Sequence, residues 1–398
     1  MLKELKNGRG KVFFGCFLLM FIMQGCLQSF PIFMPQIAKD TGWKVSQIVI
    51  CSTTGCSSAF IFNMLLPKAL RRLTPKQILL IGCLFLSAEL IVSGLSKNVY
   101  VYWLAGILSG IPIAWGTSSP CTIIITNWFE KNRSQFVAGV VGAAMFGSVV
   151  VNPLMAVVIG AIGWRKAYIC QSVIGGVLAV LVVLFLIQSS PEGEKLQKAE
   201  EQVKNRSSVK KDVKFFLMAA GIFLIGLSTN AENYLPAFWQ SKGLSSTTAS
   251  LIMSCYAFFA AIGAMFMSRI NDRLGGKKYV LLTCVVFVVP LLIMSYTGVV
   301  SILPLLIVCC VPLSLGAKKA VVMTPPLIVN EAYGRENYSS AIGFFAAMLQ
   351  LGVAASNLII GPLTEVGYDR AFTVMVILNN LGAVCLFFVP FRKEPSNK

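Results

Sequence analysis

Four charged residues stand inside long apolar stretches of this chain, and they are its first candidates for chemistry: Glu89, Glu232, Lys318 and Lys319. A charge at the centre of a bilayer costs about 2.5–3.5 kcal/mol on insertion scales, so such residues usually face a cavity or a partner. The sequence therefore predicts that these side chains bind a solute, carry a proton or form pairs.

Lys318 and Lys319 are adjacent, so their side chains point about 100° apart on a helix. Both ammonium groups cannot face one narrow cavity. We expect one to bind an anionic solute and the other to pair, or to extend toward the cytoplasm. The alternative is that both serve an ion pair, or an interfacial position if this helix is shifted.

The two acidic residues are the candidates for proton coupling. Glu232 has two equal interpretations, as a proton carrier or as the partner of a helix break before Pro236. Glu89 falls mid-membrane in its predicted helix. A hydrogen bond between helices is the favoured interpretation for Glu89, with a proton site as the alternative.

Uncharged polar side chains recur at a similar depth in several apolar stretches. Pairs such as Gln24 and Gln28, four residues apart, share one helix face. Each such residue alone more often bonds neighbouring helices, but a belt of them favours a water-filled cavity. Trp115 either packs in the core or forms a wall of that cavity. The predicted substrate site comprises Lys318, Lys319, Gln24, Gln28, Trp115, Asn230, Asn233, Tyr256, Gln350 and Asn357.

The composition is that of a polytopic membrane protein. Hydrophobic residues make up 56% of the chain and charged residues 13%, whereas soluble domains carry about 25% charged residues. A membrane-spanning helix needs about 20 apolar residues. On that basis we predict twelve spans, at residues 12–36, 46–67, 77–96, 101–127, 134–160, 165–188, 214–240, 246–269, 277–297, 301–329, 338–362 and 370–391.

A polar segment divides the chain into similar halves. Residues 189–213 are rich in Lys and Glu and contain no aromatic residue, which predicts a solvated linker. Pro35 and Pro236 end the first and seventh spans with a separation of 201 residues. The predicted fold is an all-α membrane protein with twelve helices in two pseudo-symmetric six-helix bundles, residues 1–188 and 214–398. Small residues Gly139, Ala143 and Gly147 on the fifth span are expected at a sliding interface between the halves.

The net charge of +18 is distributed as short basic clusters at the ends of apolar stretches, which excludes a nucleic-acid-binding interpretation. Most Lys and Arg residues fall on one side, so we expect a multi-pass protein of the plasma membrane with both termini cytoplasmic. The chain has no His and no nucleophile–base or metal-ligand constellation. We therefore expect no enzyme activity, no metal and no cofactor. The expected partners are the lipid bilayer and a small solute, with the protein itself monomeric.

One loop resembles a known family. The segment Asn271-Asp272-Arg273-Leu274-Gly275-Gly276-Lys277-Lys278 is similar to the cytoplasmic loop motif of the major facilitator superfamily. A degraded copy in the first half retains Arg72. Asn127-Trp128-Phe129 followed by Arg133, and Gly361-Pro362 followed by Tyr368-Asp369-Arg370, resemble the oxalate/formate-antiporter and monocarboxylate-transporter-like branch.

The resemblance implies a gate formed by Asp272, Arg273, Gly275, Arg72 and Arg133. In that family the Asp meets the positive N-terminal end of a helix of the other half, here the helix near Ser134, and latches one conformation. The alternative is a simple tight turn with interfacial charges.

These features together predict a secondary active transporter of a small organic anion, such as a monocarboxylate. It would work by alternating access, with proton symport or anion exchange. No phosphate-binding loop is present, so the driving force is a gradient. Two alternatives are export of amphipathic or drug-like compounds and a membrane receptor that does not transport.

Overall fold

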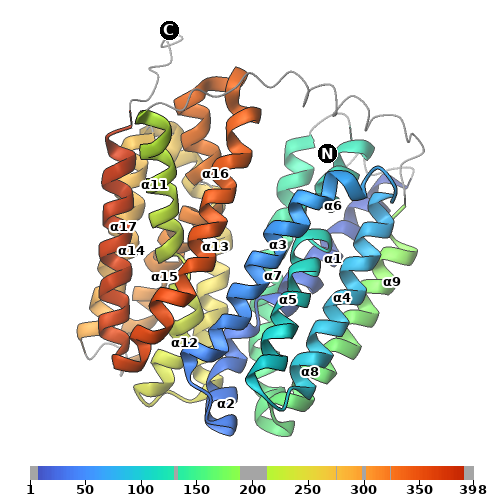
Figure 1. Ribbon diagram of the computed structural model, residues 1–398, viewed down its shortest axis with the longest axis horizontal. Helices are drawn as coiled ribbons and strands as arrows, with labels where there is room; N and C mark the ends of the chain where they lie inside the picture. The colour runs from blue at the N-terminus through green and yellow to red at the C-terminus, as the bar shows by residue number, and fades with distance from the viewer. Residues whose placement is uncertain are drawn as a thin grey trace. The chain divides into compact units, whose positions relative to one another are not determined.

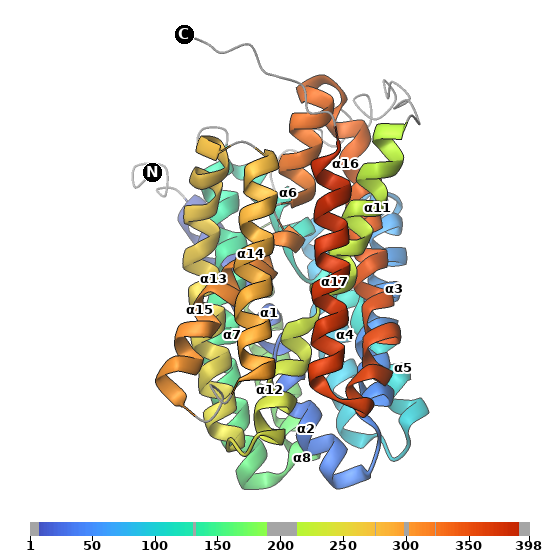
Figure 2. The ribbon, with the colours of Figure 1, turned by 90° about the vertical axis from the view of Figure 1, so that its left-hand side faces the viewer.

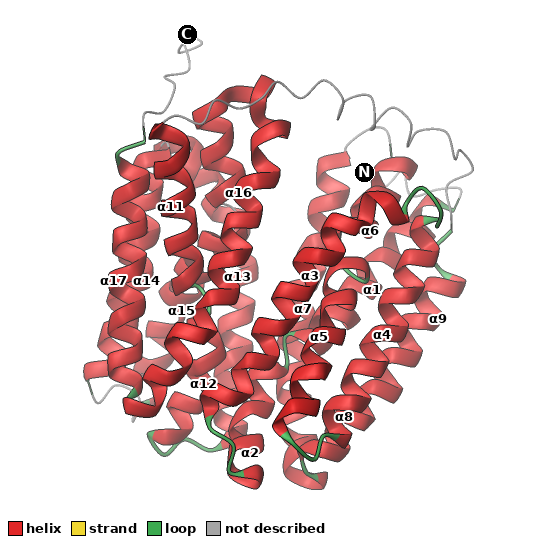
Figure 3. Cartoon of the chain, viewed as in Figure 1, coloured by secondary structure: helices red, strands yellow, loops and turns green. Residues whose placement is uncertain are grey.

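The computed structural model describes residues 8–129, 133–188, 213–274, 276–297, 302–322 and 324–389. Helices joined by short turns make up these residues, and none of the described residues forms a strand (Figures 1 and 3). Nine described helices are long and apolar enough to cross a membrane. Three shorter apolar helices, Ser246–Ala260, Val280–Tyr296 and Leu303–Leu315, occupy the remaining predicted spans. The predicted all-α fold with twelve spans is thus confirmed.

The helices of the first half are α1 (Arg9–Leu27), α2 (Phe30–Thr41), α3 (Val45–Ala69), α4 (Pro75–Leu95), α5 (Val99–Trp115), α6 (Ser118–Trp128), α7 (Arg133–Ile162), α8 (Trp164–Gln171), the π-helix η2 (Ser172–Gly176) and α9 (Val177–Phe185). Those of the second half are α11 (Val213–Ser228), α12 (Ala231–Ser241), α13 (Ser246–Leu274), α14 (Gly276–Tyr296), α15 (Leu303–Val322), α16 (Thr324–Val366) and α17 (Tyr368–Phe387).

Local sequence signals fix several of these boundaries. The Thr74 hydroxyl accepts from the Gln77 backbone N–H, and the Gln77 side chain accepts from the Thr74 backbone N–H, so a capping box begins α4. The Asn98 side chain accepts from the Val101 backbone N–H and begins α5. At the other end of a helix, Gly42 follows α2 with a positive φ of 71°, a conformation that glycine adopts without strain.

Three predicted spans are interrupted. The first span breaks between α1 and α2, the fourth between α5 and α6, and the seventh between α11 and α12. The junction of α15 and α16 includes residue 323, which lies outside the described residues. In the first and fourth spans a proline follows the break, because proline lacks an N–H and its ring clashes with the carbonyl four residues earlier. Pro31 stands four residues after Leu27, the last residue of α1, and Pro120 stands four residues after Gly116, the C-cap of α5.

The seventh span breaks for a different reason. The Ser228 hydroxyl donates to the Ile225 carbonyl at 2.8 Å, and the Thr229 hydroxyl donates to the Gly226 carbonyl at 2.8 Å. Such local bonds compete with the helical hydrogen bonds of the backbone. The break therefore falls at Thr229 and Asn230, where two hydroxyl residues precede an asparagine.

Contacts between helices divide the chain into two compact units. Unit 1 comprises Met1–Leu196 and Leu235–Ala261, and unit 2 comprises Gln197–Tyr234 and Ile262–Lys398. The segment Leu235–Ala261 thus groups with unit 1, whereas the sequence predicted a division at the linker alone. Of that linker, residues 189–212 lie outside the described residues, so the predicted domain boundaries stay a prediction.

Within unit 1, α1 packs along α7, and α5 packs between α3 and α4. Small residues permit these close approaches. A side chain at Gly25 would meet the Gly147 carbonyl oxygen at 3.1 Å, and one at Gly147 would collide with the Phe21 carbonyl oxygen. Gly147 therefore serves packing inside unit 1, which corrects its predicted place at a sliding interface.

Unit 2 repeats this arrangement. α11 packs along α16 and α17, and α17 lies beside α14 (Figure 2). A side chain at Gly226 would lie 2.6 Å from the Leu349 carbonyl oxygen, and one at Gly352 would collide with the Phe223 carbonyl oxygen. Gly226 follows Gly25 by 201 residues, the same separation as that of Pro35 and Pro236. The repeat predicted from the prolines is thus matched by equivalent helix contacts.

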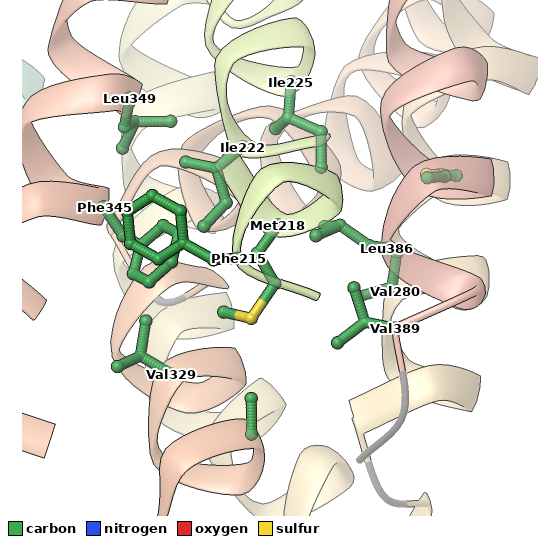
Figure 4. Packing of buried hydrophobic residues seen from close by; sticks show 13 residues of the cluster. Phe215, Met218, Ile222, Ile225, Val280, Val329, Phe345, Leu349, Leu386 and Val389 are labelled. Atoms are coloured by element: carbon green, nitrogen blue, oxygen red, sulfur yellow. The ribbon is translucent and has the colours of Figure 1, made fainter. Parts of the chain in front are cut away.

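An apolar cluster holds the helices of unit 2 together. Phe215, Met218 and Ile222 of α11 pack against Phe345 and Leu349 of α16 (Figure 4). Val280 of α14 and Leu386 of α17 complete the same cluster. This core holds the end of α11 that precedes the break, so the polar residues at the break are carried by a well-packed helix.

Candidate substrate site

The helix breaks carry several of the residues predicted for the substrate site. Gln28 caps the end of α1, Trp115 is the last residue of α5, and Asn230 lies between α11 and α12. Lys318 and Lys319 precede the end of α15 at Val322 by a few residues. A break leaves backbone donors and acceptors without helical partners. Each of the three described breaks therefore offers main-chain polar groups beside a side chain predicted for the site.

The most complete polar cluster lies in unit 2, at the break between α11 and α12. The Asn230 amide nitrogen donates to the Val353 carbonyl at 2.9 Å and to the Asn357 side-chain oxygen at 3.3 Å. The Tyr234 hydroxyl donates to the same Asn357 oxygen at 3.3 Å. Asn357 is only 1% exposed. The structure thus brings together Asn230 and Asn357, both predicted for the site, and Tyr234, which was not. They come from the seventh and eleventh spans.

This network fixes the orientation of both amides. The Asn230 nitrogen must face the Val353 carbonyl, since only a donor can bond there. Asn357 must then present its oxygen to Asn230 and Tyr234. The Asn357 amide nitrogen consequently points away from both, and it has no hydrogen-bond partner among the described residues. A buried donor without a partner destabilises the folded protein, so this group is suited to donate a hydrogen bond to an acceptor atom of a solute.

A second buried amide, that of Asn379 on α17, lies beside Ser228 at the end of α11. The Ser228 hydroxyl lies 3.2 Å from the Asn379 side-chain oxygen, and Asn379 is 4% exposed. The amide nitrogen of Asn379 likewise has no hydrogen-bond partner in the described part of the chain. Sequence reasoning missed Asn379, although an asparagine inside the apolar twelfth span was a usable signal.

The other predicted residues of the seventh and eleventh spans stand apart from this cluster. Asn233 is half-buried and bonds through its backbone N–H to the Asn230 carbonyl at 3.0 Å. Gln350 is exposed, whereas Asn357, seven residues further along the same helix, is buried. Glu232 lies in the first turn of α12. Pro236, before which a helix break was one interpretation of Glu232, lies inside α12, and the break precedes Ala231.

In unit 1 the break between α1 and α2 is held by a neighbouring helix. The Gln171 amide nitrogen donates to the Ser29 hydroxyl at 2.9 Å, and that hydroxyl donates to the Cys26 carbonyl at 2.7 Å. The predicted residues Gln24 and Gln28, beside this break, are half-buried. Ser29 precedes Asn230 by 201 residues, the separation that relates the two halves, so the two residues occupy equivalent positions. The predicted site included neither Ser29 nor Gln171, although both are polar residues within predicted spans.

Trp115 ends α5 inside its span rather than lying in the middle of a continuous helix. Its indole N–H donates to the Phe62 carbonyl at 2.9 Å, and its ring meets the Phe62 ring edge-on at 5.4 Å between centroids. The ring is half-buried, so it packs against α3 while one side stays accessible. Tyr256 of α13 is 1% exposed and groups with unit 1.

Glu89 occupies the interior of unit 1 and is 9% exposed. Its carboxyl group hydrogen-bonds to Ser93 of its own helix, α4. The other carboxylate oxygen, Oε2, has no hydrogen-bond partner among the described residues. The expected hydrogen bond between helices is therefore not among the contacts that the structure describes.

Several predicted side chains lie outside the described part of the structure. The backbone of Lys318 and Lys319 belongs to α15, that of Asp272 and Arg273 to α13, and Arg133 begins α7. The side chains of these five residues, and all of Gly275, are not described. Arg72 is exposed in the turn between α3 and α4. The proposed latch at Asp272 thus stays a prediction.

Comparison with known proteins agrees with this arrangement. The profile described as Major Facilitator Superfamily matches residues 12–245 and 233–398. The chain is 20% identical over 241 residues to the uncharacterized MFS-type transporter YcxA of Bacillus subtilis (strain 168). That alignment covers 60% of this chain and 57% of YcxA, so it spans little more than half of the relative.

Solved transporters share the fold. The nucleoside transporter NupG superposes with a TM-score of 0.74 at 14% identity, covering 96% of this chain and 98% of NupG. A bacterial homolog of the human lysosomal transporter Spinster, in an inward-facing and unoccupied conformation, gives a TM-score of 0.76 at 13% identity, covering 96% and 97%. With the profile matching both halves of the sequence, the chain belongs to the major facilitator superfamily.

Proposed function

We propose that this protein is a secondary active transporter that carries a small organic anion across the plasma membrane by alternating access. The observation that carries the proposal is the recurrence of helix breaks in the first, fourth and seventh spans, beside predicted site residues. Discontinuous helices form the substrate sites of many secondary transporters, because the freed backbone groups and helix ends bind solutes and ions.

The preference for an anion rests on Lys318 and Lys319. Both precede the end of α15 in an otherwise apolar stretch, and α15 contains no acidic residue to pair with them. An ammonium group at this depth needs a counter-charge or water. A carboxylate-bearing solute supplies that charge. The unpartnered amide nitrogen of Asn357 in unit 2 offers a donor suited to a carboxylate oxygen.

A neutral polar solute is the second candidate, and the cluster of Asn230, Tyr234 and Asn357 favours it. Amide and phenol groups both donate and accept hydrogen bonds, so they suit hydroxyl and ring-nitrogen groups as well as carboxylates. The lysines distinguish the two candidates. An anion requires one of them, whereas a neutral solute does not.

The orientation and coupling belong to the same proposal. The distribution of Lys and Arg favours both termini in the cytoplasm. Coupling takes place by proton symport or anion exchange, and the protein acts as a monomer. The narrower similarity to the oxalate/formate and monocarboxylate branch rests on Asn127-Trp128-Phe129 and Gly361-Pro362, and it supports a monocarboxylate as the first solute to test.

The experiment is uptake into proteoliposomes that contain the purified full chain. The panel holds labelled monocarboxylates, dicarboxylates, a nucleoside and an amphipathic cation, each with and without a pH gradient. The proposal predicts saturable uptake of at least one carboxylate over empty liposomes. Uptake of the nucleoside alone would favour the neutral-solute candidate, and transport of the amphipathic cation alone would favour an exporter.

A further inference from the structure

The buried carboxyl group of Glu89 is the intramembrane charge that the proposed substrate site does not use. It lies on α4 in unit 1, well inside the helix bundle, with 9% of its surface exposed. Ser93, one turn further along α4, hydrogen-bonds to one side of the carboxyl group. The opposite oxygen, Oε2, has no hydrogen-bond partner among the described residues. Half of this buried group is therefore unsatisfied as a carboxylate.

Four other helices contribute titratable groups that interact electrostatically with Glu89. They are the thiols of Cys26 on α1 and Cys51 on α3, and the phenols of Tyr102 on α5 and Tyr168 on α8. The elements η2 and α9, which also pack on α4, contain no titratable residue. Cys121 of α6 interacts with Cys16 and Cys83 instead. Within the described part of the chain, no Lys or Arg contacts the Glu89 carboxyl group.

This environment disfavours a negative charge. An ionised carboxylate that is buried without a cation, and with an oxygen lacking a donor, keeps almost none of its hydration energy. A protonated carboxyl group avoids the charge. The Tyr102 and Tyr168 hydroxyls hydrogen-bond to each other at 3.1 Å and bring no positive charge to this region.

The packing around this site leaves little room for a larger ligand. A side chain at Gly94 of α4 would lie 2.7 Å from the Arg165 carbonyl oxygen, and one at Gly175 of η2 would lie 2.7 Å from the Cys26 sulfur. Thiols and phenols are also poor ligands for sodium, which prefers carboxylate, carbonyl and water oxygens. A proton needs no volume and no coordination shell.

We propose that Glu89 is the proton-binding site of unit 1 and that it holds its proton in the conformation described here. This inference deepens the proposed transport function, because it assigns proton rather than sodium coupling. It also separates the two acidic candidates by position: Glu89 is buried inside unit 1, whereas Glu232 lies in the first turn of α12. Release of the Glu89 proton requires water or a cation to reach it, hence a rearrangement of the helices around it.

That rearrangement has a structural route to the substrate path. Cys26, which interacts electrostatically with Glu89, belongs to the last turn of α1, and its carbonyl accepts from the Ser29 hydroxyl at the break before α2. Gln171 binds the same hydroxyl and is followed at once by η2. A π-helix within an α-helix often marks a functional site. Movement at this break changes the surroundings of Glu89 and of Gln28 together.

The test does not depend on knowing the solute. Infrared spectra of the purified full chain in lipid are recorded for the unaltered protein, Glu89→Gln and, as a matched control, Asp40→Asn, whose carboxylate is exposed and accepts from the Trp164 indole N–H at 2.9 Å. At neutral pH we expect the carbonyl-stretch band of a protonated carboxylic acid, lost in Glu89→Gln and kept in Asp40→Asn. If Glu89→Gln instead removes only carboxylate bands, the inference is wrong.

A pH titration of the unaltered protein covers the case in which Glu89→Gln does not fold. The protonated band must be present at neutral pH and be replaced by carboxylate bands at alkaline pH; its absence at neutral pH contradicts the inference. In proteoliposomes, a pH gradient should stimulate solute uptake at least tenfold less in Glu89→Gln than in the unaltered protein. Stimulation by a sodium gradient alone would overturn proton coupling. Failure of the whole solute panel would refute the proposed function and leave the infrared result standing.

Discussion

At the scale of single residues, the buried amides carry more information than the charges. Asn357 accepts from both Asn230 and Tyr234, and its own amide nitrogen is left for another acceptor. The polarity of the belt was predictable from the sequence, whereas the hydrogen bonds between the seventh and eleventh spans required the structure. The exposure of Gln350 also required the structure, since two residues on one face of a helix can differ in how deeply they are buried.

Replacement of Asn357 by Ala tests the role of this amide. It removes the amide nitrogen proposed to bind the solute, and a hydrogen bond to a charged group contributes about 1.5–3 kcal/mol. Since 1.4 kcal/mol corresponds to a tenfold change in affinity, we expect solute affinity to fall by about tenfold or more. Ser356→Ala is the matched control, because the Ser356 hydroxyl is buried and has no hydrogen-bond partner among the described residues. Binding is measured by calorimetry on the first solute found in the uptake panel; equal affinities for the two variants would refute the role.

At the scale of helices, the apolar stretches predicted the positions of the spans but not the breaks within them. Counting apolar residues measures length, and it is insensitive to a backbone that is interrupted at Gln28 or Gly116. In the first and fourth spans the missing signal was a proline, Pro31 or Pro120, placed four to five residues after the last residue of the preceding helix. The break in the seventh span, at Thr229 and Asn230, involves side-chain hydrogen bonds that become evident only in the folded chain.

The close approach of α11 and α16 gives a stability prediction. Gly226→Ala would place a methyl group 2.6 Å from the Leu349 carbonyl oxygen. That distance is too short for a contact, so one of the two helices would have to shift. Such overpacking costs about 1–3 kcal/mol. We expect a lower midpoint of thermal unfolding in detergent. Gly160→Ala on α7 is the control, because nothing lies within 4 Å of its added methyl group. Equal midpoints would contradict the tight packing of this pair.

The end of α15 gives a prediction for the lysines. On a helix the two side chains point about 100° apart, so at most one faces a narrow site. We expect Lys318→Gln or Lys319→Gln to abolish binding of the anionic solute, and the other variant to lower mainly stability or rate. Each variant is also titrated with a matched neutral analogue. Unchanged anion affinity in both variants would remove the main support for an anion and favour the neutral solute.

At the scale of the whole molecule, the repeat links the two halves of the sequence. The same separation of 201 residues relates Pro35 to Pro236, Gly25 to Gly226, and Ser29 to Asn230. Each half thus places a tight helix contact and a break at equivalent positions of its first span. Major facilitator halves related in this way alternate around a mid-membrane site. The sequence predicted the repeat from its prolines, whereas the contacts at Gly25 and Gly226 required the structure.

Counterflow in proteoliposomes tests alternating access by an organic anion most directly. Liposomes containing the full chain are loaded with an unlabelled monocarboxylate and diluted into a trace of the same labelled compound. We predict transient accumulation of the label above equilibrium, at least several-fold over empty liposomes, because a carrier returns faster when loaded than when empty. Equal entry of the label with and without internal carboxylate, for every carboxylate tested, would contradict the account.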